Sequence, residues 1–522
     1  MKEDIIRKNI ARLLAVVFGC TTAFILIVNL LKSCFSRVLH YYFELETLLP
    51  NPVLMLCGTL FVLCLFFVCK TTEGQRNPEL TLWRPKRTPL LITGVAFFVI
   101  QIYMIYNYCF ETGWDVQILL DSARSLANGR RPFQNIWYYS NYPNNIFLTV
   151  IFAVILWITK PLHLGAYDFL AIVTVQSLLC VLTGFMLYQL IVRRWHRRDL
   201  AWLGMVLYLL LVGLSPWTSI PYSDAWGILI PIATLWAYYC SILENRKFLR
   251  WFLIAFLAYL GFKIKPQVFF VFLSIAAIEV VAALLRREKT TVRELLCRKG
   301  LIGACAGLAS AFLFVGIIIV ARPVPHRAKD RFGAAHFLMM GMNQTSFGGY
   351  CDDDVDFARQ YKTPKERNKA ELTEARRRIH EMGLAGCSQL LCEKTLINYY
   401  DGTFSWGKEG PFLKTLFPEP NHHLAPFLRN LYYNRTIQGA YYPYWCTGAT
   451  AVWFGVLVLM FLAALGKQDR FTAALMLSIL LLTLYESIFE ARARYLYAYI
   501  PFYILLALQG ISNGERIISK RH

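Results

Sequence analysis

The feature that most constrains this chain is a series of long blocks that are almost free of charged residues. A helix needs about 20 consecutive apolar residues to cross the hydrocarbon core of a bilayer. Core helices of a soluble protein would instead place polar residues along one face at helical spacing. The pattern therefore predicts an all-α polytopic membrane protein with roughly 11–13 transmembrane helices. The blocks cover residues 9–31, 52–69, 89–109, 167–192, 200–214, 301–321, 443–466, 471–489 and 496–509.

Composition and charge placement agree with a membrane protein. Hydrophobic residues make up 57% of the 522 residues and charged residues 17%, against about 45–50% and 25% in soluble domains. The net charge of +21 comes from short basic clusters at the ends of the blocks, such as residues 193–198. Basic loops of this kind stay in the cytoplasm. A nucleic-acid-binding surface would need the charge on one soluble face, so we expect a lipid bilayer as partner and no nucleic acid.

The positive-inside rule gives a predicted topology. With the N-terminus inside, the block at 89–110 delivers an outer loop at 111–144. If the short apolar stretch 145–160 crossed fully, the basic residues 193–198 would lie outside. We therefore predict that 145–160 is tilted, partial or re-entrant, and that the C-terminus lies inside. The chain is then a multi-pass protein of the cell membrane, expected to be a bacterial plasma membrane.

The domain organisation follows from the same topology. Residues 1–321 form an N-terminal membrane region, 322–442 an α-rich extracytoplasmic lobe, and 443–522 the C-terminal membrane helices. Thr363-Pro364-Lys365-Glu366 has the form of a capping box, which predicts a helix to about Gly383. A second helix is predicted over 386–399.

Metal and disulfide chemistry have little support in the sequence. No Cys/His cluster is present, so no cofactor is predicted, and a divalent metal is left open. The acidic run at 352–356 lacks the glycine and glutamate of an EF-hand loop. Cys351, Cys387 and Cys392 share the lobe, where a disulfide between them is open.

An acidic group in the outer loop is the first candidate for chemistry. Asp115 follows Trp114 directly after an apolar block. A carboxylate at the mouth of a helix bundle is costly to bury, which suggests function. As a general base it would deprotonate an acceptor hydroxyl. The alternative, at about even odds, is that Asp115 only caps a helix. Asp121 and Asp224 are the reserve catalytic candidates.

Basic residues at the ends of other blocks are candidates for binding a phosphate. Lys263 and Lys265 interrupt an apolar run, and Arg492 and Arg494 precede the last block. Lysines between apolar segments are costly unless they meet an anion or reach water. A lipid-linked phosphate would satisfy them, with bidentate contacts from arginine. Alternatively, they reach lipid headgroups or pair with the acidic residues 486 and 490. Because the two lysines lie two positions apart, one alone is expected to point into the cavity.

A loop of the lobe mixes glycines, aromatic rings and charges over residues 401–410, with Trp406 at its centre. Aromatic faces stack on sugars, and the flanking polar groups read hydroxyls. The same composition is also typical of aromatic anchors at a membrane surface. The two interpretations have equal support.

The order of these features resembles the GT-C superfamily of membrane glycosyltransferases, near the protein mannosyltransferase and aminoarabinose transferase branch. The resemblance implies transfer of a sugar from a polyprenyl-phosphate donor to an extracytoplasmic glycan, lipid or protein of the cell envelope. It also implies substrate contacts from Trp114, Tyr142, Asn144, Trp406, Glu490 and Tyr495. The matching segments are Trp114-Asp115, Tyr142-Pro143-Asn144-Asn145, Lys265-Pro266 and Arg494-Tyr495.

Other functional classes share part of this pattern. A transporter or flippase of a lipid-linked precursor needs the same cationic cavity, but it does not need Asp115 as a base. A non-catalytic membrane scaffold needs neither feature. The sequence has no phosphate-cradling glycine loop, which disfavours a cytosolic nucleotide-sugar donor.

Overall fold

A computed structural model describes residues 2–35, 37–38, 47–74, 87–285, 298–434, 439–466 and 468–519. Within these residues, ten helical segments are long and apolar enough to cross a membrane. Three further helices of the body are too short or too charged to be included in that number: α9 (Arg198–Tyr208), α11 (Leu229–Tyr239) and α13 (Lys247–Ile264). The predicted polytopic α-helical fold is confirmed.

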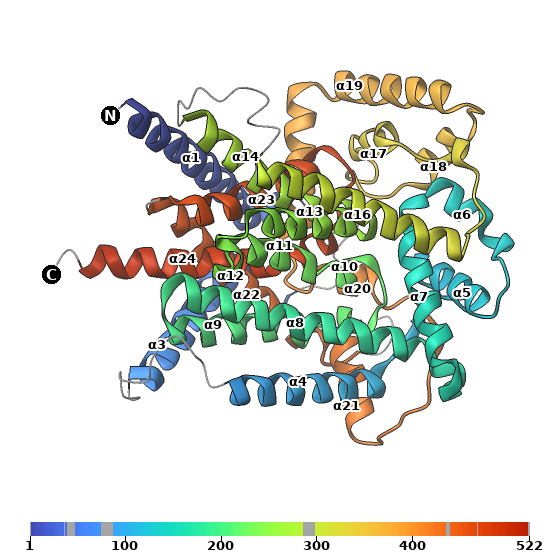
Figure 1. The fold of residues 1–522 in the computed structure, drawn as a ribbon, viewed down its shortest axis with the longest axis horizontal. Coiled ribbons are helices and arrows are strands. Elements are labelled where there is room, and N and C mark those ends of the chain that lie inside the picture. The colour runs from blue at the N-terminus through green and yellow to red at the C-terminus, as the bar shows by residue number, and fades with distance from the viewer. Residues whose placement is uncertain are drawn as a thin grey trace.

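The body is a bundle of long helices that run in broadly similar directions (Figure 1). Before the predicted lobe the chain forms α1 (Lys2–Leu30), α3 (Asn51–Gly74), α4 (Arg87–Tyr108), α7 (Ile146–Thr159), α8 (Phe169–Trp195), α14 (Phe270–Leu285) and α16 (Lys299–Ala321). After the lobe it forms α22 (Tyr442–Phe461), α23 (Arg470–Ile488) and α24 (Ile500–Ser519).

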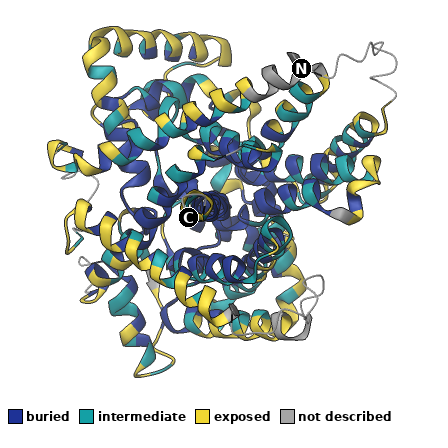
Figure 2. Cartoon of the chain, turned by 90° about the vertical axis from the view of Figure 1, so that its left-hand side faces the viewer, coloured by how far each residue is buried: buried dark blue, intermediate teal, exposed yellow. Residues whose placement is uncertain are grey.

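The last helix lies at the centre of this bundle. Of the 18-residue apolar stretch within Ala493–Ser519, 94% is buried by other parts of the chain, against 17% for the corresponding stretch of α16. Figure 2 shows buried residues surrounding the C-terminal helix and exposed residues at the periphery. A helix that is apolar all round and enclosed by others is a core element, whereas α16 presents its apolar surface to lipid.

Small residues set the distance between two of the helices. Gly303 and Gly307 of α16 lie against the backbone of α13, where an added Cβ would come within 2.2 and 2.3 Å of the carbonyl oxygens of Phe248 and Phe252. Glycines four positions apart allow membrane helices to approach closely, and dispersion contacts then hold the pair together. Any larger residue at either position would separate α13 from α16.

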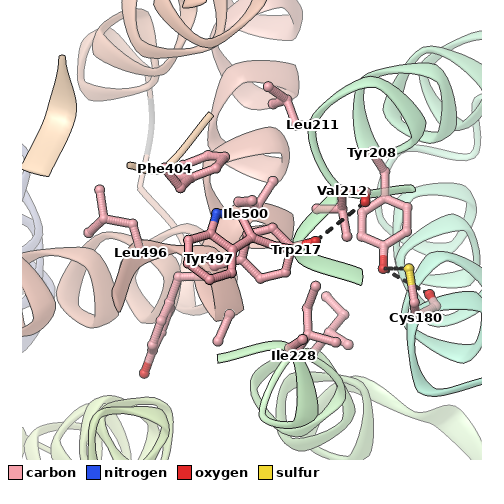
Figure 3. Packing of buried hydrophobic residues seen from close by; sticks show 14 of the residues in the cluster. Cys180, Tyr208, Leu211, Val212, Trp217, Ile228, Phe404, Leu496, Tyr497 and Ile500 are labelled. Atoms are coloured by element: carbon pink, nitrogen blue, oxygen red, sulfur yellow. Dashed lines mark hydrogen bonds between the residues drawn. The ribbon is translucent and has the colours of Figure 1, made fainter. Parts of the chain in front are cut away.

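The interior joins segments that are far apart in the sequence (Figure 3). The Trp217 indole N–H donates to the carbonyl of Thr403 at 3.0 Å. The Tyr497 hydroxyl donates to the carbonyl of Val212 at 3.3 Å. Buried aromatic side chains therefore connect the loop after α19 and the segment before α24 to residues 212–217, which follow α9. Their N–H and O–H groups have hydrogen-bond partners.

The chain begins and ends at the same end of the bundle (Figure 1). Ion pairs gather at this inner end. Glu515 pairs with Lys70 at 2.6 Å and with Arg197. Arg194 pairs with Asp469 at 2.6 Å. The basic residues predicted to lie in the cytoplasm are thus found beside both termini.

The opposite end carries short helices and a small sheet. Strand β1 (Phe110–Thr112) pairs antiparallel with β2 (Leu413–Leu416) and joins the loop after α4 to the region before α22. The short helices there are α5 (Asp115–Ala127), α6 (Ile136–Asn141), α17 (Ala334–Gly341) and α18 (Asp352–Arg359). By length and composition, 143–162 is one of the ten segments able to cross. That 145–160 crosses only partly stays a prediction.

A long bent helix dominates the predicted lobe. Helix α19 (Pro364–Tyr399) begins where the Thr363 side chain accepts from the Glu366 amide at 3.3 Å, and it kinks at Gly383. This agrees with the two helices predicted on either side of that glycine. Asp354 of the acidic run pairs with Arg378 of α19 at 2.5 Å, so the run has a structural partner. Cys351, Cys387 and Cys392 are free thiols.

Candidate functional site

Loop ends from distant parts of the chain meet at the end of the bundle that carries the small sheet. Asp115 opens α5, and Lys265 lies between α13 and the 3-10 helix η8 (Pro266–Phe269). Asp224 lies in α10 (Ser223–Trp226), and Arg494 in the 3-10 helix η12 (Ala493–Tyr499). Glu409 ends α20 (Trp406–Glu409). We call these residues, with Trp114, Tyr222, Glu490, Arg492 and Tyr495, the outer cluster.

Asp115 is placed by a tyrosine rather than by a capping role. It is the first residue of α5, whose N-cap is Trp114 and has no side-chain cap hydrogen bond. The capping alternative is therefore wrong. The half-buried carboxylate instead accepts from the Tyr222 hydroxyl at 2.9 Å. Burial raises the pKa of that hydroxyl, and the Asp115 charge raises it further. Tyr222 is thus held as a neutral donor to Asp115.

Aromatic rings surround one arginine of the cluster. Trp114 and Tyr222 meet edge to face with ring centroids 4.8 Å apart. The Arg494 guanidinium carbon lies 4.5 Å from the Trp114 centroid and 5.1 Å from that of Tyr222. These distances are within the range of cation–π attraction. The buried Trp114 indole N–H makes no hydrogen bond within the described part of the chain. A donor of this kind is available to a polar ligand beside Asp115.

Arg494 also connects two carboxylates that lie far apart in the sequence. Its guanidinium donates to Asp224 at 3.2 Å, and Asp224 pairs with Lys265 as well. Its Nε lies 2.7 Å from a Glu409 oxygen. The two atoms are close enough for an ion pair but are not aligned for a hydrogen bond. Neither has another hydrogen-bond partner among the described residues. Asp224, Lys265 and Arg494 are all buried, so each charge depends on its partners for solvation.

A second arginine extends the network toward the lobe. Arg492 pairs with Glu490 at 2.6 Å and with Glu409 at 3.0 Å. The Tyr495 hydroxyl donates to the other Glu490 oxygen at 3.1 Å. Burial alone would raise the pKa of Glu490, but the guanidinium groups of Arg492 and Arg494 and these hydrogen bonds lower it by more. The pKa of Glu490 therefore lies below its ordinary value. Glu490 is therefore ionised and shared between its neighbours.

The predicted phosphate ligands are arranged unevenly. Lys265, Arg492 and Arg494 belong to the outer cluster, where each already has a carboxylate partner. Lys263 is apart from them, with its ammonium 5.6 Å from the Tyr259 ring. The two lysines thus point in different directions, as their spacing requires. Binding a phosphate here would require it to displace carboxylates from the cations.

The three predicted acids have different surroundings. Asp224 is 2% exposed and held between two cations. Asp121 accepts from Gln117 at 2.7 Å and lies 3.6 Å from Arg124, and its side chain is 44% exposed. Asp115 combines contact with the cluster and partial access to solvent.

Three predicted substrate contacts lie outside the cluster. Trp406 is 0% exposed, with its ring 5.2 Å from that of Trp217 and its indole N–H bonded to the Tyr432 carbonyl. Packing covers the ring, so both predictions for Trp406, a face that stacks on a sugar and an anchor at the membrane surface, are wrong. Tyr142 is half-buried, 5.4 Å from Phe332, and Asn144 is exposed.

The structure adds residues that sequence reasoning did not assign. Tyr222 and Glu409 lie in segments that were singled out, but neither was given a role. Lys394 gave no signal, because it lies in a helix with many charges. It is buried, and its ammonium donates to the carbonyls of Gly341 and Phe489 at 3.0 and 2.6 Å. Burial lowers its pKa to about 7.

No group of three or more His, Cys, Asp or Glu residues suited to a metal ion occurs in the described ranges.

Comparison with known proteins places the chain in a family. No curated protein matches the chain, and no solved structure matches it. Residues 5–513 match a family described as conserved hypothetical integral membrane protein. The match covers nearly the whole chain, which therefore belongs to this family of integral membrane proteins.

Proposed function

We propose that the chain is a membrane glycosyltransferase that transfers a sugar from a polyprenyl-phosphate donor to an extracytoplasmic acceptor, with Asp115 as general base. The observation that carries this proposal is the half-buried Asp115 carboxylate, which is oriented by Tyr222 beside the unsatisfied Trp114 indole. A base must be held in place and open to its substrate, and the contact with Tyr222 and the partial exposure of Asp115 support this role.

The proposed reaction needs only the donor, the acceptor and residues of the outer cluster. An acceptor O–H gives its proton to Asp115, and the oxygen attacks the anomeric carbon of the donor. The bond between that carbon and the phosphate oxygen breaks, and polyprenyl phosphate leaves with the electron pair. Arg492 and Arg494 stabilise the leaving charge once they exchange a carboxylate for the phosphate. The paired network thus keeps the cations buried between turnovers.

A transfer assay tests this proposal directly. Purified protein in nanodiscs is incubated with a polyprenyl-phosphate hexose and a mixture of acceptor glycans. Mass spectrometry follows the release of polyprenyl phosphate. Release that depends on protein and is lost in Asp115→Asn supports the transferase. If the wild-type protein neither binds nor cleaves any donor of a panel of polyprenyl-phosphate hexoses and pentoses, the proposal is overturned.

One observation favours a second function, a transporter or flippase of a lipid-linked precursor. Lys265 and Arg494 of the outer cluster are buried, Arg492 is half-buried, and all three pair with carboxylates from other segments of the chain. Ion pairs that exchange partners are a means of coupling helix movement to an anionic substrate. Transport of a fluorescent lipid-phosphate across proteoliposomes that is unchanged in Asp115→Asn would favour this function over transfer.

A further inference from the structure

Helix α19 carries an apolar side chain with no cover. Leu384 is 87% exposed, the largest fraction among the exposed large hydrophobic side chains of the described residues. The next, Val320 at 78%, lies in the membrane-spanning helix α16, where lipid covers it. Leu384 instead follows the kink at Gly383, in the predicted outer lobe. A single exposed leucine is common on a protein surface, so its meaning depends on what lies beside it.

The segment after the kink reaches the body at the end of a membrane helix. Its residues Leu396 and Ile397 are buried with Val28 of α1, and Cys392 packs against the same group. The membrane-spanning part of α1 ends at Leu30. Figure 1 shows this segment of α19 running across the direction of the long helices, beside the lobe end of α1. It therefore lies at the level where α1 leaves the hydrocarbon core.

The two halves of this segment have different surroundings. Residues 393–399, including the charged Glu393 and Lys394, are all buried in the body. In the first half Leu390 is buried, whereas Leu384 and Leu391, seven positions apart and so on one face, are 87% and 37% exposed, and Ser388 and Gln389 are exposed as well. Two exposed leucines on one face of a helix that leads to the end of α1 are suited to contact with lipid.

We propose that residues 384–391 lie on the bilayer surface, with Leu384 inserted at the boundary between headgroups and acyl chains of the leaflet on the lobe side. Val28 of α1 contacts this segment, and within one turn of Val28 the apolar Ile27, Leu30 and Leu31 are exposed. The kink at Gly383 turns the helix from the lobe into the plane of the membrane, and the lobe is thereby held against the bilayer.

Accessibility to a water-soluble reagent tests this proposal. Leu384→Cys and Lys369→Cys are prepared separately and placed in phosphatidylcholine nanodiscs at one copy per disc. Both positions are exposed on α19, but Lys369 belongs to the segment before the kink. Each is labelled with a membrane-impermeant maleimide, and tandem mass spectrometry separates the new thiol from the native Cys387 and Cys392. Because reactivity requires access to water, we expect Leu384→Cys to react about tenfold more slowly than Lys369→Cys.

Two results would overturn the proposal. Equal labelling rates in single-copy nanodiscs would show that Leu384 faces water. Protection that appears in crowded liposomes but not in single-copy discs would show that a second copy of the chain, rather than lipid, covers the segment.

Discussion

The two ends of the bundle use the same residue types in opposite environments. At the inner end, Arg194 and Asp469 form an ion pair with 30% and 49% of their side chains exposed. In the outer cluster, Lys265 and Asp224 pair with 4% and 2% exposed. Exposed pairs contribute about 0–1 kcal/mol and are screened by salt. Buried pairs carry a desolvation penalty that can exceed the attraction.

This difference separates topology from chemistry. The ion pairs of the inner end neutralise basic loops that the sequence predicts to lie in the cytoplasm, and they need no further purpose. The outer cluster places carboxylates and cations at a depth where apolar residues would stabilise the bundle equally well or better. Charge at such a position is favoured when a substrate requires it.

The largest expected effect comes from breaking a buried pair. Asp224→Asn leaves Lys265 buried without its direct carboxylate partner, which should lower the stability by about 3–5 kcal/mol. Combined replacement of Asp224 by Asn and Lys265 by Met removes both charges and should recover part of that loss. The midpoint of thermal unfolding in detergent measures both variants. If Asp224→Asn unfolds at the wild-type temperature, the pair is not buried as described.

The second prediction concerns Asp115. Asp115→Asn keeps the size of the side chain but cannot accept a proton, so sugar transfer should fall about 100-fold or more. Donor binding and the unfolding temperature should stay near wild type, because the side chain makes no capping hydrogen bond. Asp121→Asn, on the same helix, is the matched control and should retain activity. Wild-type turnover by Asp115→Asn would refute its role as base.

The sequence predicted helices well and contacts poorly, for physical reasons. Apolar length and the Thr363 cap are local signals, and they located the membrane helices and both halves of α19. The contact of Asp224 with Arg494 joins residues 270 positions apart. It depends on how several helices pack, which no local pattern records. Trp406 shows the converse, because the loop at 401–410 predicted either a binding surface or an aromatic anchor at the membrane surface, and the structure buries the ring in the core.

The third prediction uses Lys394, a buried cation that has carbonyls in place of a carboxylate partner. Its pKa is about 7 in the folded protein, against an ordinary value of 10.5. Between these values the unfolded chain holds the proton and the folded chain does not, so stability should rise with pH, by at most about 1.4 kcal/mol per pH unit. Below pH 7 this contribution to the slope should vanish.

Unfolding temperatures measured between pH 6 and 9 test this prediction. Glu486 and Glu490 are the charged groups that act on Lys394, and both raise its pKa. Lys394→Met should remove the rise, and Lys369→Met, at an exposed position of the same helix, should keep it. An identical pH profile in wild type and Lys394→Met would show that Lys394 stays protonated in the folded protein.

The smallest effect is expected at the inner end, and it tests the comparison from the other side. Arg194→Gln removes the 2.6 Å pair with Asp469 and should change stability by about 0–1 kcal/mol, with less effect at high salt. Asp469→Ala should cost about 1 kcal/mol more, because the Asp469 carboxylate also caps α23 through the Thr472 amide at 2.9 Å. Unfolding temperatures at low and high salt distinguish the two contributions, since screening weakens the ion pair more than the cap. If Arg194→Gln destabilises the protein as strongly as Asp224→Asn, exposure does not account for the difference between the two ends.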